Sequence, residues 1–236
     1  MIVKKQDFIE VTSEKDGSYL ASTNIDGILG LAFQECSATN TVPVWYNMMN
    51  QDLVQQKVFS IWLKYSNEQD HEEGGAIVFG GFDNAHFRGE HTYVPITYEQ
   101  FWEFKMEEIL LGGIGTGLCV DGCSAIIDSG ESYVFGPTDI VTNINKALGA
   151  DEVGNVDCNK VPSMPTVSLT IGGRVFSLST RDYISKDNSG GRDCATKFRG
   201  SDDDFWTLGY VFMRPYHTIF DFGNKKIGFA DAVQDN

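Results

Sequence analysis

The residues best suited to chemistry are Asp128, Ser129 and Gly130, which directly follow the aliphatic run at positions 125–127. A strand that ends in this way presents a carboxylate at the mouth of a fold, and a positioned carboxylate can act as a general acid or base. An apolar pair closed by glycine follows at 206–209. The alternative interpretation of Asp128 is an ordinary turn residue at the end of a strand.

Other motifs that could carry chemistry are weaker. Ser129 has no recognisable histidine partner and lacks the G-x-S-x-G context of a nucleophilic serine. The glycine-rich run at 112–117 lacks the strand–turn–helix setting of a phosphate loop, so we interpret it as a hairpin. His86 and His91 are too isolated to indicate a metal site. We therefore expect neither a metal nor a cofactor.

The elements that must position these residues are mostly short strands. Hydrophobic residues make up 42% of the 236 residues and aromatic residues 12%, with 25 glycines, a mix that favours strands joined by turns. Residues 1–36 are interpreted as strands, chiefly 8–12 and 27–33. Further strands are expected at 58–65, 75–81, 91–96, 101–111, 124–128 and 167–171.

Two helices and a terminal hairpin complete this prediction. One helix is expected at 43–51, opened by Pro43. A second follows 136–137, with Thr138 as its cap and Gly149 as its end. Residues 186–204 are expected to form a polar loop. The tail at 216–221 and 226–230 is expected to form a hairpin, so the Asp-Phe-Gly triplet at 221–223 is a turn rather than a kinase metal site.

Charge and cysteine content narrow the class of protein. The net charge of −15 and pI near 4.5 argue against nucleic acid or an anionic membrane surface as a partner. The sequence contains no apolar run long enough for a membrane span, and its first residues do not resemble a signal peptide. The five cysteines fit two local disulfides plus Cys36, which indicates an oxidising compartment. Cys119 and Cys123 could close a small turn.

A weak internal similarity suggests that the sequence contains two related halves. The apolar run that ends at Gly30 is similar in type to the one that ends at Gly209, which lies 81 residues after Asp128. If the halves are repeats, the same spacing puts a first aspartate loop roughly 50 residues before Met1.

Several motifs, taken in order, resemble the pepsin family of aspartic peptidases, and its cathepsin D-like members most closely. They include IDGILGLAF at 25–33, GGAIVFGGFD at 74–83, AIIDSG at 125–130 and WTLGYVF at 206–212. The resemblance implies an all-β, pepsin-like bilobal fold with few short helices and an incomplete N-terminal lobe. Residues 1–80 would be the remainder of that lobe with the inter-lobe strands, and residues 81–236 the C-terminal catalytic lobe.

The family activity implied is proteolysis by a water molecule activated between two aspartates that share a proton. The resemblance implies Asp128 as the catalytic aspartate of this chain, with Ser129 and Gly130 supporting it. It also implies cleft-lining residues and two disulfides, namely Phe101, Tyr133 and Phe212, and the pairs Cys119–Cys123 and Cys158–Cys194. Polypeptide substrates, and a lysosomal or other acidic vesicle or secretion as the location, follow from the same resemblance.

The chain also departs from the family pattern. Glu131 stands where the family has Ser or Thr, and Tyr210 stands where a small polar residue is usual. Only one aspartate loop is present, so a second aspartate must come from an N-terminal lobe segment or light chain. The alternative is a non-catalytic relative that binds peptides or acts as an antigen. Self-association of two copies through Asp128 is a third hypothesis, which the bulk of residues 1–65 would obstruct.

Overall fold

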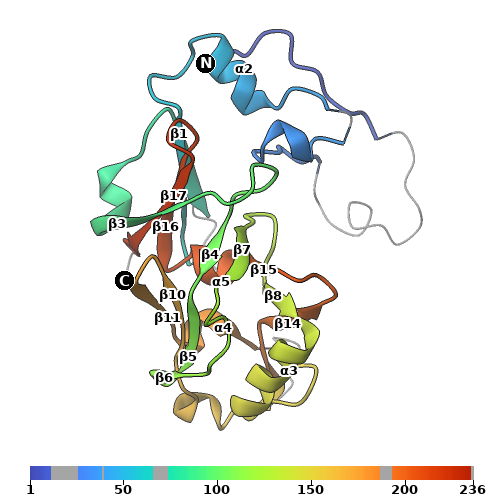
Figure 1. Cartoon of the computed structure of the whole chain (residues 1–236), viewed down its shortest axis with the longest axis vertical. Coiled ribbons are helices and arrows are strands. Elements are labelled where there is room, and N and C mark those ends of the chain that lie inside the picture. The colour runs from blue at the N-terminus through green and yellow to red at the C-terminus, as the bar shows by residue number, and fades with distance from the viewer. Residues whose placement is uncertain (12–25, 39, 66–73, 187–192, 235–236) are drawn as a thin grey trace.

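The computed structural model describes residues 1–11, 26–38, 40–65, 74–186 and 193–234, and it is built mainly of short strands (Figure 1). In these described residues the strands form four sheets, two of five strands, one of four and one of three. The helix α2 and the N-terminal segment lie at one end of the molecule, and α3 lies at the other. The all-β fold class is therefore confirmed.

The first five-stranded sheet is entirely antiparallel and has the order β2-β1-β16-β17-β3. Its strands are β1 (Val58–Leu63), β2 (Gly75–Phe79), β3 (Phe87–Pro95), β16 (Tyr216–Asp221) and β17 (Lys226–Ala232). The predicted terminal hairpin is confirmed. In its turn, the Asp221 carboxylate accepts the backbone N–H of Asn224 at 2.9 Å, and Lys225 adopts a positive φ of 51°.

The second five-stranded sheet has the order β14-β8-β15-β7-β4 and contains two parallel pairs. Its strands are β4 (Glu103–Met106), β7 (Cys123–Ile127), β8 (Val134–Pro137), β14 (Phe198–Ser201) and β15 (Trp206–Leu208). Strand β15 lies between β7 and β8, which are consecutive in sequence. It runs parallel to β7 and antiparallel to β8.

The smaller sheets cover the rest of the same half. One has the order β11-β10-β5-β6, formed by β5 (Glu108–Leu111), β6 (Ile114–Gly115), β10 (Val167–Ile171) and β11 (Arg174–Leu178). The predicted hairpin at 112–117 is the β5–β6 turn, where Gly112 and Gly113 both have positive φ. The three-stranded sheet has the order β12-β13-β9, formed by β9 (Asn155–Asp157), β12 (Ile184–Lys186) and β13 (Asp193–Thr196).

The expected polar loop at 186–204 is only partly correct. Within it lie the end of β12 and the strands β13 and β14, while residues 187–192 fall outside the described residues. The polar composition concealed these strands because backbone pairing with β9 and β8 holds them, and backbone pairing does not depend on side-chain type.

The helices are few and short. They are η1 (Gln34–Cys36), α2 (Val44–Asn50), η2 (Asn84–His86), α3 (Thr138–Ala147), η3 (Val161–Ser163), α4 (Thr180–Tyr183) and α5 (Tyr210–Met213). The prediction of α2 is confirmed, with Trp45 fully buried. In the described part of the chain, no helix has the length and apolar character needed to cross a membrane.

The long helix α3 packs against β8 and β14 through its apolar face, with Val141 and Ile144 buried. Its predicted end is confirmed, because Gly149 follows the last turn with φ of 78°. The predicted cap is wrong. Pro137 is the cap residue, and the Thr138 hydroxyl instead donates to the carbonyl of Ser201 at 3.0 Å.

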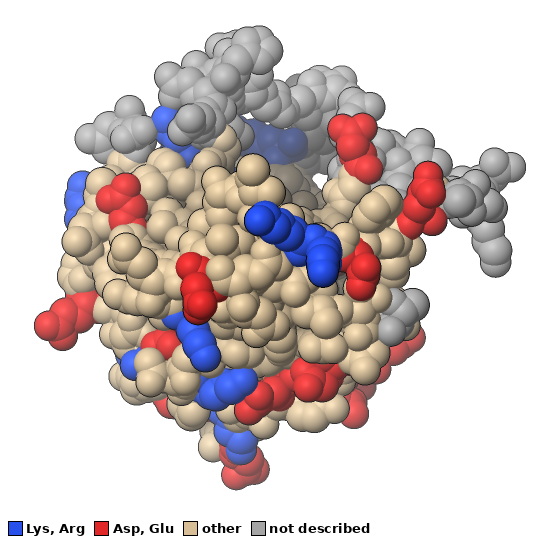
Figure 2. Space-filling model, turned by 90° about the horizontal axis from the view of Figure 1, so that it is seen from above, with Lys and Arg blue, Asp and Glu red and all other residues tan. Residues whose placement is uncertain are grey.

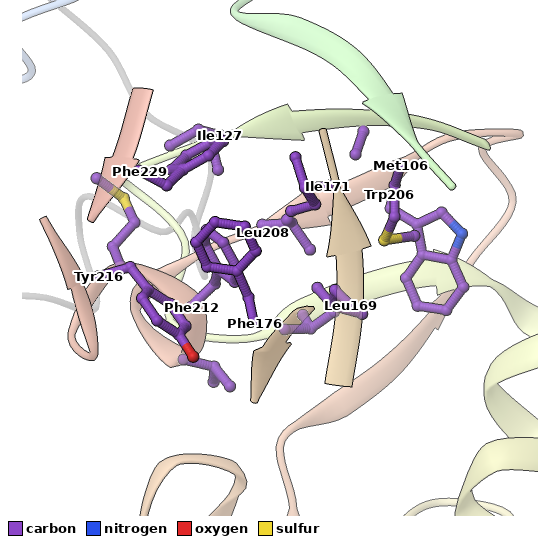
Figure 3. Close-up of a cluster of buried hydrophobic side chains, with 14 of the residues drawn as sticks. Met106, Ile127, Leu169, Ile171, Phe176, Trp206, Leu208, Phe212, Tyr216 and Phe229 are labelled. Carbon is purple, nitrogen blue, oxygen red and sulfur yellow. The ribbon is translucent and has the colours of Figure 1, made fainter. Parts of the chain in front are cut away.

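Aromatic side chains dominate the core between the sheets. The rings of Phe176, Phe212, Tyr216 and Phe229 pack together, with the ring centroids of Phe212 and Phe229 5.3 Å apart in an edge-to-face arrangement (Figure 3). Phe212 is 0% exposed. The expectation that it lines a cleft is therefore not met, because its helix α5 turns this side chain into the core.

The N-terminal part differs most from the prediction. In residues 1–11 and 26–36, the expected strands do not form, and Phe8 and Ile28 are 81% and 79% exposed. This part is fixed at Phe33, which is 2% exposed and packs against Trp102 with ring centroids 4.9 Å apart. The Trp102 indole N–H also donates to the carbonyl of Leu31 at 3.0 Å.

Candidate active site

The candidate site is the turn that leaves the buried strand β7. Ala125, Ile126 and Ile127 are at most 7% exposed, and β4 and β15 flank them in the sheet. Apolar side chains make this strand a rigid core element. Asp128 follows it immediately, and its backbone N–H donates to the carbonyl of Leu208 at 3.2 Å, which extends the β7–β15 pairing to the aspartate itself.

The turn fixes the Asp128 carboxylate. Its Oδ1 accepts the backbone N–H of Gly130 at 2.8 Å, and its carbonyl accepts the N–H of Glu131 at 3.2 Å. A Cβ on Gly130 would lie only 3.1 Å from that same Oδ1. Glycine therefore lets the backbone approach the carboxylate closely. Asp128 is half-buried, whereas Ser129 and Gly130 are exposed, so the carboxylate lies at the protein surface.

The start of α5 locks the same turn from the other side. Gly209 donates its N–H to the carbonyl of Tyr133 at 3.1 Å, and Tyr210 donates to that of Glu131 at 2.8 Å. A Cβ on Gly209 would lie 2.3 Å from the Glu131 carbonyl oxygen. This contact could not be predicted from the local pattern, since it joins residues far apart in the chain. Only the presence of a glycine after the apolar pair could have suggested it.

Acidic neighbours set the electrostatics of the turn. Burial and, second, the charge of Asp128 raise the pKa of Glu131 above its ordinary value. Burial and then the same charge also raise the pKa of the free Cys36 thiol. The effect on Cys36 places η1 within electrostatic range of the Asp128 carboxylate, a proximity that sequence reasoning missed.

A surface cavity of about 480 Å³ borders Ser129. Its other walls come from β1, β2 and the residues Tyr210 and Arg214 at either end of α5. The Arg214 guanidinium carbon lies 5.6 Å from the centroid of the Tyr210 ring. This cavity brings together three segments that are distant in sequence, and sequence reasoning did not identify Arg214 or the β1–β2 residues.

The remaining predicted site residues lie apart from this cavity. Phe101 is half-buried, with its ring centroid 6.3 Å from that of Phe205. Tyr133 is half-buried, and the guanidinium carbon of Arg199 lies 4.8 Å from its ring centroid. Phe212 belongs to the core, as described above. The structure thus brings Asp128, Ser129 and Gly130 together in one turn, and a cleft-lining role for Phe101 and Tyr133 stays a prediction.

Both disulfides implied by the resemblance are present in the structure. Cys119 and Cys123 close the turn before β7, and Cys158 and Cys194 join the end of β9 to β13. Among the described residues, no group of three or more His, Cys, Asp or Glu side chains is arranged to hold a metal ion.

Comparison with known proteins assigns the family. The chain is 47% identical to Cardosin-F of Cynara cardunculus over 237 residues, covering 99% of this chain and 75% of that protein. It is 35% identical to Procardosin-B of the same plant over 344 residues, covering 99% of this chain and 67% of that protein. Aspartic proteinase A2 of Arabidopsis thaliana is also 35% identical, over 347 residues, with the same coverages.

The chain thus spans about two thirds to three quarters of the length of these relatives. The sequence model of the family described as "Eukaryotic aspartyl protease" matches residues 1–232. That match covers nearly the whole chain, including the turn at Asp128. The protein belongs to the eukaryotic aspartyl protease family.

Proposed function

We propose that this protein is an aspartic endopeptidase in which this chain supplies one catalytic aspartate, Asp128. The observation that carries the proposal is the geometry of the turn after β7. A half-buried carboxylate is held there by the Gly130 N–H, and strand β15 fixes its backbone. Ser129 and Gly130 support the carboxylate rather than react. Peptide bonds in extended polypeptides are the substrates.

The chemistry requires two carboxylates close together. Two such groups cannot both ionise, and aspartic proteases are the established case of a pair that shares one proton. The ionised member removes a proton from water while the protonated member polarises the scissile carbonyl. Asp128 alone provides half of this pair. The second aspartate would come from a partner polypeptide, namely an N-terminal lobe segment or light chain.

Exposed apolar surface supports such a partner. Five apolar side chains are 57–81% exposed, and all of them line a cavity of about 870 Å³ between residues 6–11 and 26–44, namely Phe8, Ile9, Val11, Ile28 and Leu29. Exposed apolar patches of this kind mark contact sites in soluble proteins. Figure 2 shows this end of the molecule, where charged side chains are scattered over a largely uncharged surface.

The same argument supports the proposed division into a remainder of the N-terminal lobe at 1–80 and a catalytic lobe at 81–236. In that division, the sheet β2-β1-β16-β17-β3 is the inter-lobe element, since it pairs strands from both parts. The two disulfides support a location in an acidic vesicle such as the lysosome, or secretion, because disulfides persist in oxidising compartments.

The test is cleavage of a denatured protein at about pH 3 to 5, where a carboxylate pair keeps one proton. The chain is assayed alone and with any upstream segment that its gene encodes. Activity only with that segment, abolished by pepstatin and by Asp128→Asn, is the expected result. The exposed Asp202→Asn is the matched control and should leave activity unchanged.

A second candidate is a non-catalytic relative that binds peptides or acts as an antigen. The observation in its favour is Glu131, a carboxyl group beside Asp128 whose pKa is raised by burial and by that aspartate. A second acid at this position disfavours a simple proton-sharing pair with a partner. No cleavage in either form, together with no binding of pepstatin, would establish this candidate and overturn the peptidase.

A further inference from the structure

Three histidines gather at one end of the sheet β2-β1-β16-β17-β3. His86 ends η2, His91 lies in β3 and His217 lies in β16. The Nε2 of His91 and the Nδ1 of His217 are 2.9 Å apart, which is a hydrogen bond between two imidazoles. His217 is only 1% exposed, and its other nitrogen, Nε2, has no hydrogen-bond partner among the described residues.

Aromatic rings surround this pair. The Phe87 ring centroid lies 4.3 Å from that of His91 and 5.0 Å from that of His217. Trp62 stacks on His86 with ring centroids 4.3 Å apart and planes 1° from parallel. Burial among these rings disfavours a charged imidazole. It lowers the pKa of His91 to about 4 and, with further repulsion from His91 and His86, that of His217 to about 3.

The charged groups around the pair do not compensate for this burial. From β11, Arg174 lowers the pKa of His91 further, and its guanidinium is paired with Asp231 of β17 at 2.6 Å. From the segment before η2, Asp83 favours a proton on His217, but its carboxylate accepts the Ala85 N–H. Tyr93 on β3 lies 6.0 Å from His91 between ring centroids. In the described part of the chain, neither imidazole makes a hydrogen bond to a carboxylate.

The hydrogen bond itself depends on protonation. One neutral imidazole donates and the other accepts, so the pair tolerates a single added proton as a charge-assisted bond. A second proton makes both rings donors only, and two N–H groups then face each other across the 2.9 Å gap. Acid therefore removes the contact and leaves two like charges inside an aromatic cluster.

The cluster joins two segments to the sheet. The Val233 N–H donates to the carbonyl of His86 at 2.9 Å, and the Trp62 indole N–H donates to the carbonyl of Val233 at 2.7 Å. Phe87 at the start of β3 pairs with Ala232 at the end of β17. We propose that His91 and His217 form an acid-released latch, which holds the segments 83–91 and 232–234 on the sheet at neutral pH and frees them as the pH falls.

The direction follows from linkage. The closed form binds protons more weakly than the open form, whose imidazoles titrate near pH 6.5. Closure is therefore fully favoured above pH 6.5 and is progressively lost as the pH falls toward 4 and 3. For one such histidine, the ratio of open to closed forms rises about 50-fold between pH 7 and pH 4.5. This inference does not depend on the peptidase proposal.

Amide hydrogen exchange of the full chain tests the latch. The Val233 amide reports opening, and the Leu148 amide, which donates to Ile144 in α3, is the distant reference. After correction for intrinsic rates, protection of Val233 should fall between pH 7 and 4.5 by well over the about 50-fold that one histidine gives, because two histidines titrate, while protection of Leu148 holds. An unchanged Val233, or an equal fall at Leu148, would overturn the latch.

Variants separate the histidines from other effects of acid. His91→Gln replaces a titrating ring by a neutral side chain that can still donate to His217, so the fall at Val233 should shrink to about the 50-fold that His217 alone gives. Thr92→Ser, on the same strand, is the control and should retain the full fall. An undiminished fall in His91→Gln would refute the proposal. A second measurement does not require the variant to fold. NMR titration of wild-type His91 and His217 should give midpoints below 5, and midpoints near 6.5 would also refute the latch.

Discussion

Replacing Gly209 by alanine should destabilise the protein strongly, because this glycine is the contact through which α5 locks the turn after Asp128. Its φ of −91° is negative, so alanine is not forced into the left-handed region here. The main obstacle is therefore space. An added Cβ would lie 2.3 Å from the Glu131 carbonyl oxygen and 2.6 Å from that of Tyr133.

The size of the effect follows from these distances. Ordinary carbon–oxygen contacts are about 3.3 Å or longer, so the backbone must move by about 1 Å. Overpacking costs about 1 to 3 kcal/mol, and the upper end applies because the neighbours are backbone carbonyls rather than flexible side chains. Weakening the hydrogen bond from Tyr210 to Glu131 adds about 1 kcal/mol. For a chain of this size, the sum of about 3 to 4 kcal/mol lowers the melting temperature by about 10 °C.

Thermal unfolding followed by circular dichroism measures this shift. Gly81→Ala is the matched control, since a Cβ there meets no atom within 4 Å and φ is ordinary. The control should stay within about 0.5 kcal/mol of wild type. If Gly209→Ala melts within 2 °C of Gly81→Ala, the contact is not a rigid one and the reasoning fails.

Three further changes test other parts of the fold. Removing the Cys158–Cys194 disulfide, which spans 36 residues, should lower the free energy of unfolding in urea by about 4 kcal/mol. Removing Cys119–Cys123, which spans 4 residues, should lower it by only about 2 kcal/mol, because a shorter loop restricts the unfolded chain less. Equal losses would contradict this argument from loop entropy. Asp182→Asn should lower the free energy of unfolding by about 1 to 3 kcal/mol, because the Asp182 carboxylate accepts the Ser179 N–H and hydroxyl and the Tyr65 hydroxyl. An unchanged free energy of unfolding in urea would contradict this role. Glu131→Gln should raise the melting temperature above pH 4.5 and not below it. The raised pKa of Glu131 means that ionising this carboxyl destabilises the folded protein as the pH rises, and glutamine removes that cost. A gain confined to lower pH would contradict this sign.

Local patterns predicted much of the fold. Short apolar runs located β1, β2 and β10, and the glycine signal located the end of α3. These features depend on residues close in sequence, so each could be predicted from its own short segment. The Asp128 turn was predicted in the same way, as a carboxylate and glycine at the end of an aliphatic strand.

The failures share a long-range cause. A strand needs a neighbour, and the expected strands at 8–12 and 27–33 have no pairing partner in the described residues, so Phe8, Ile28 and Leu29 stay exposed. Thr138 does not cap its helix because its hydroxyl donates to the carbonyl of Ser201, 63 residues away. Phe212 was assigned to a cleft through the family resemblance, which does not reveal which way α5 faces in this chain.

The position of β15 between β7 and β8 has a consequence for synthesis on the ribosome. Pro137 ends β8, yet the strand that must fill the gap begins only at Trp206. At about 5 to 20 residues per second, the nascent chain waits roughly 3 to 14 s for it. Throughout that delay, the aliphatic strand β7 has an open edge on which other chains can aggregate. Expression conditions that supply chaperones will therefore raise the soluble yield more than changes to the finished core.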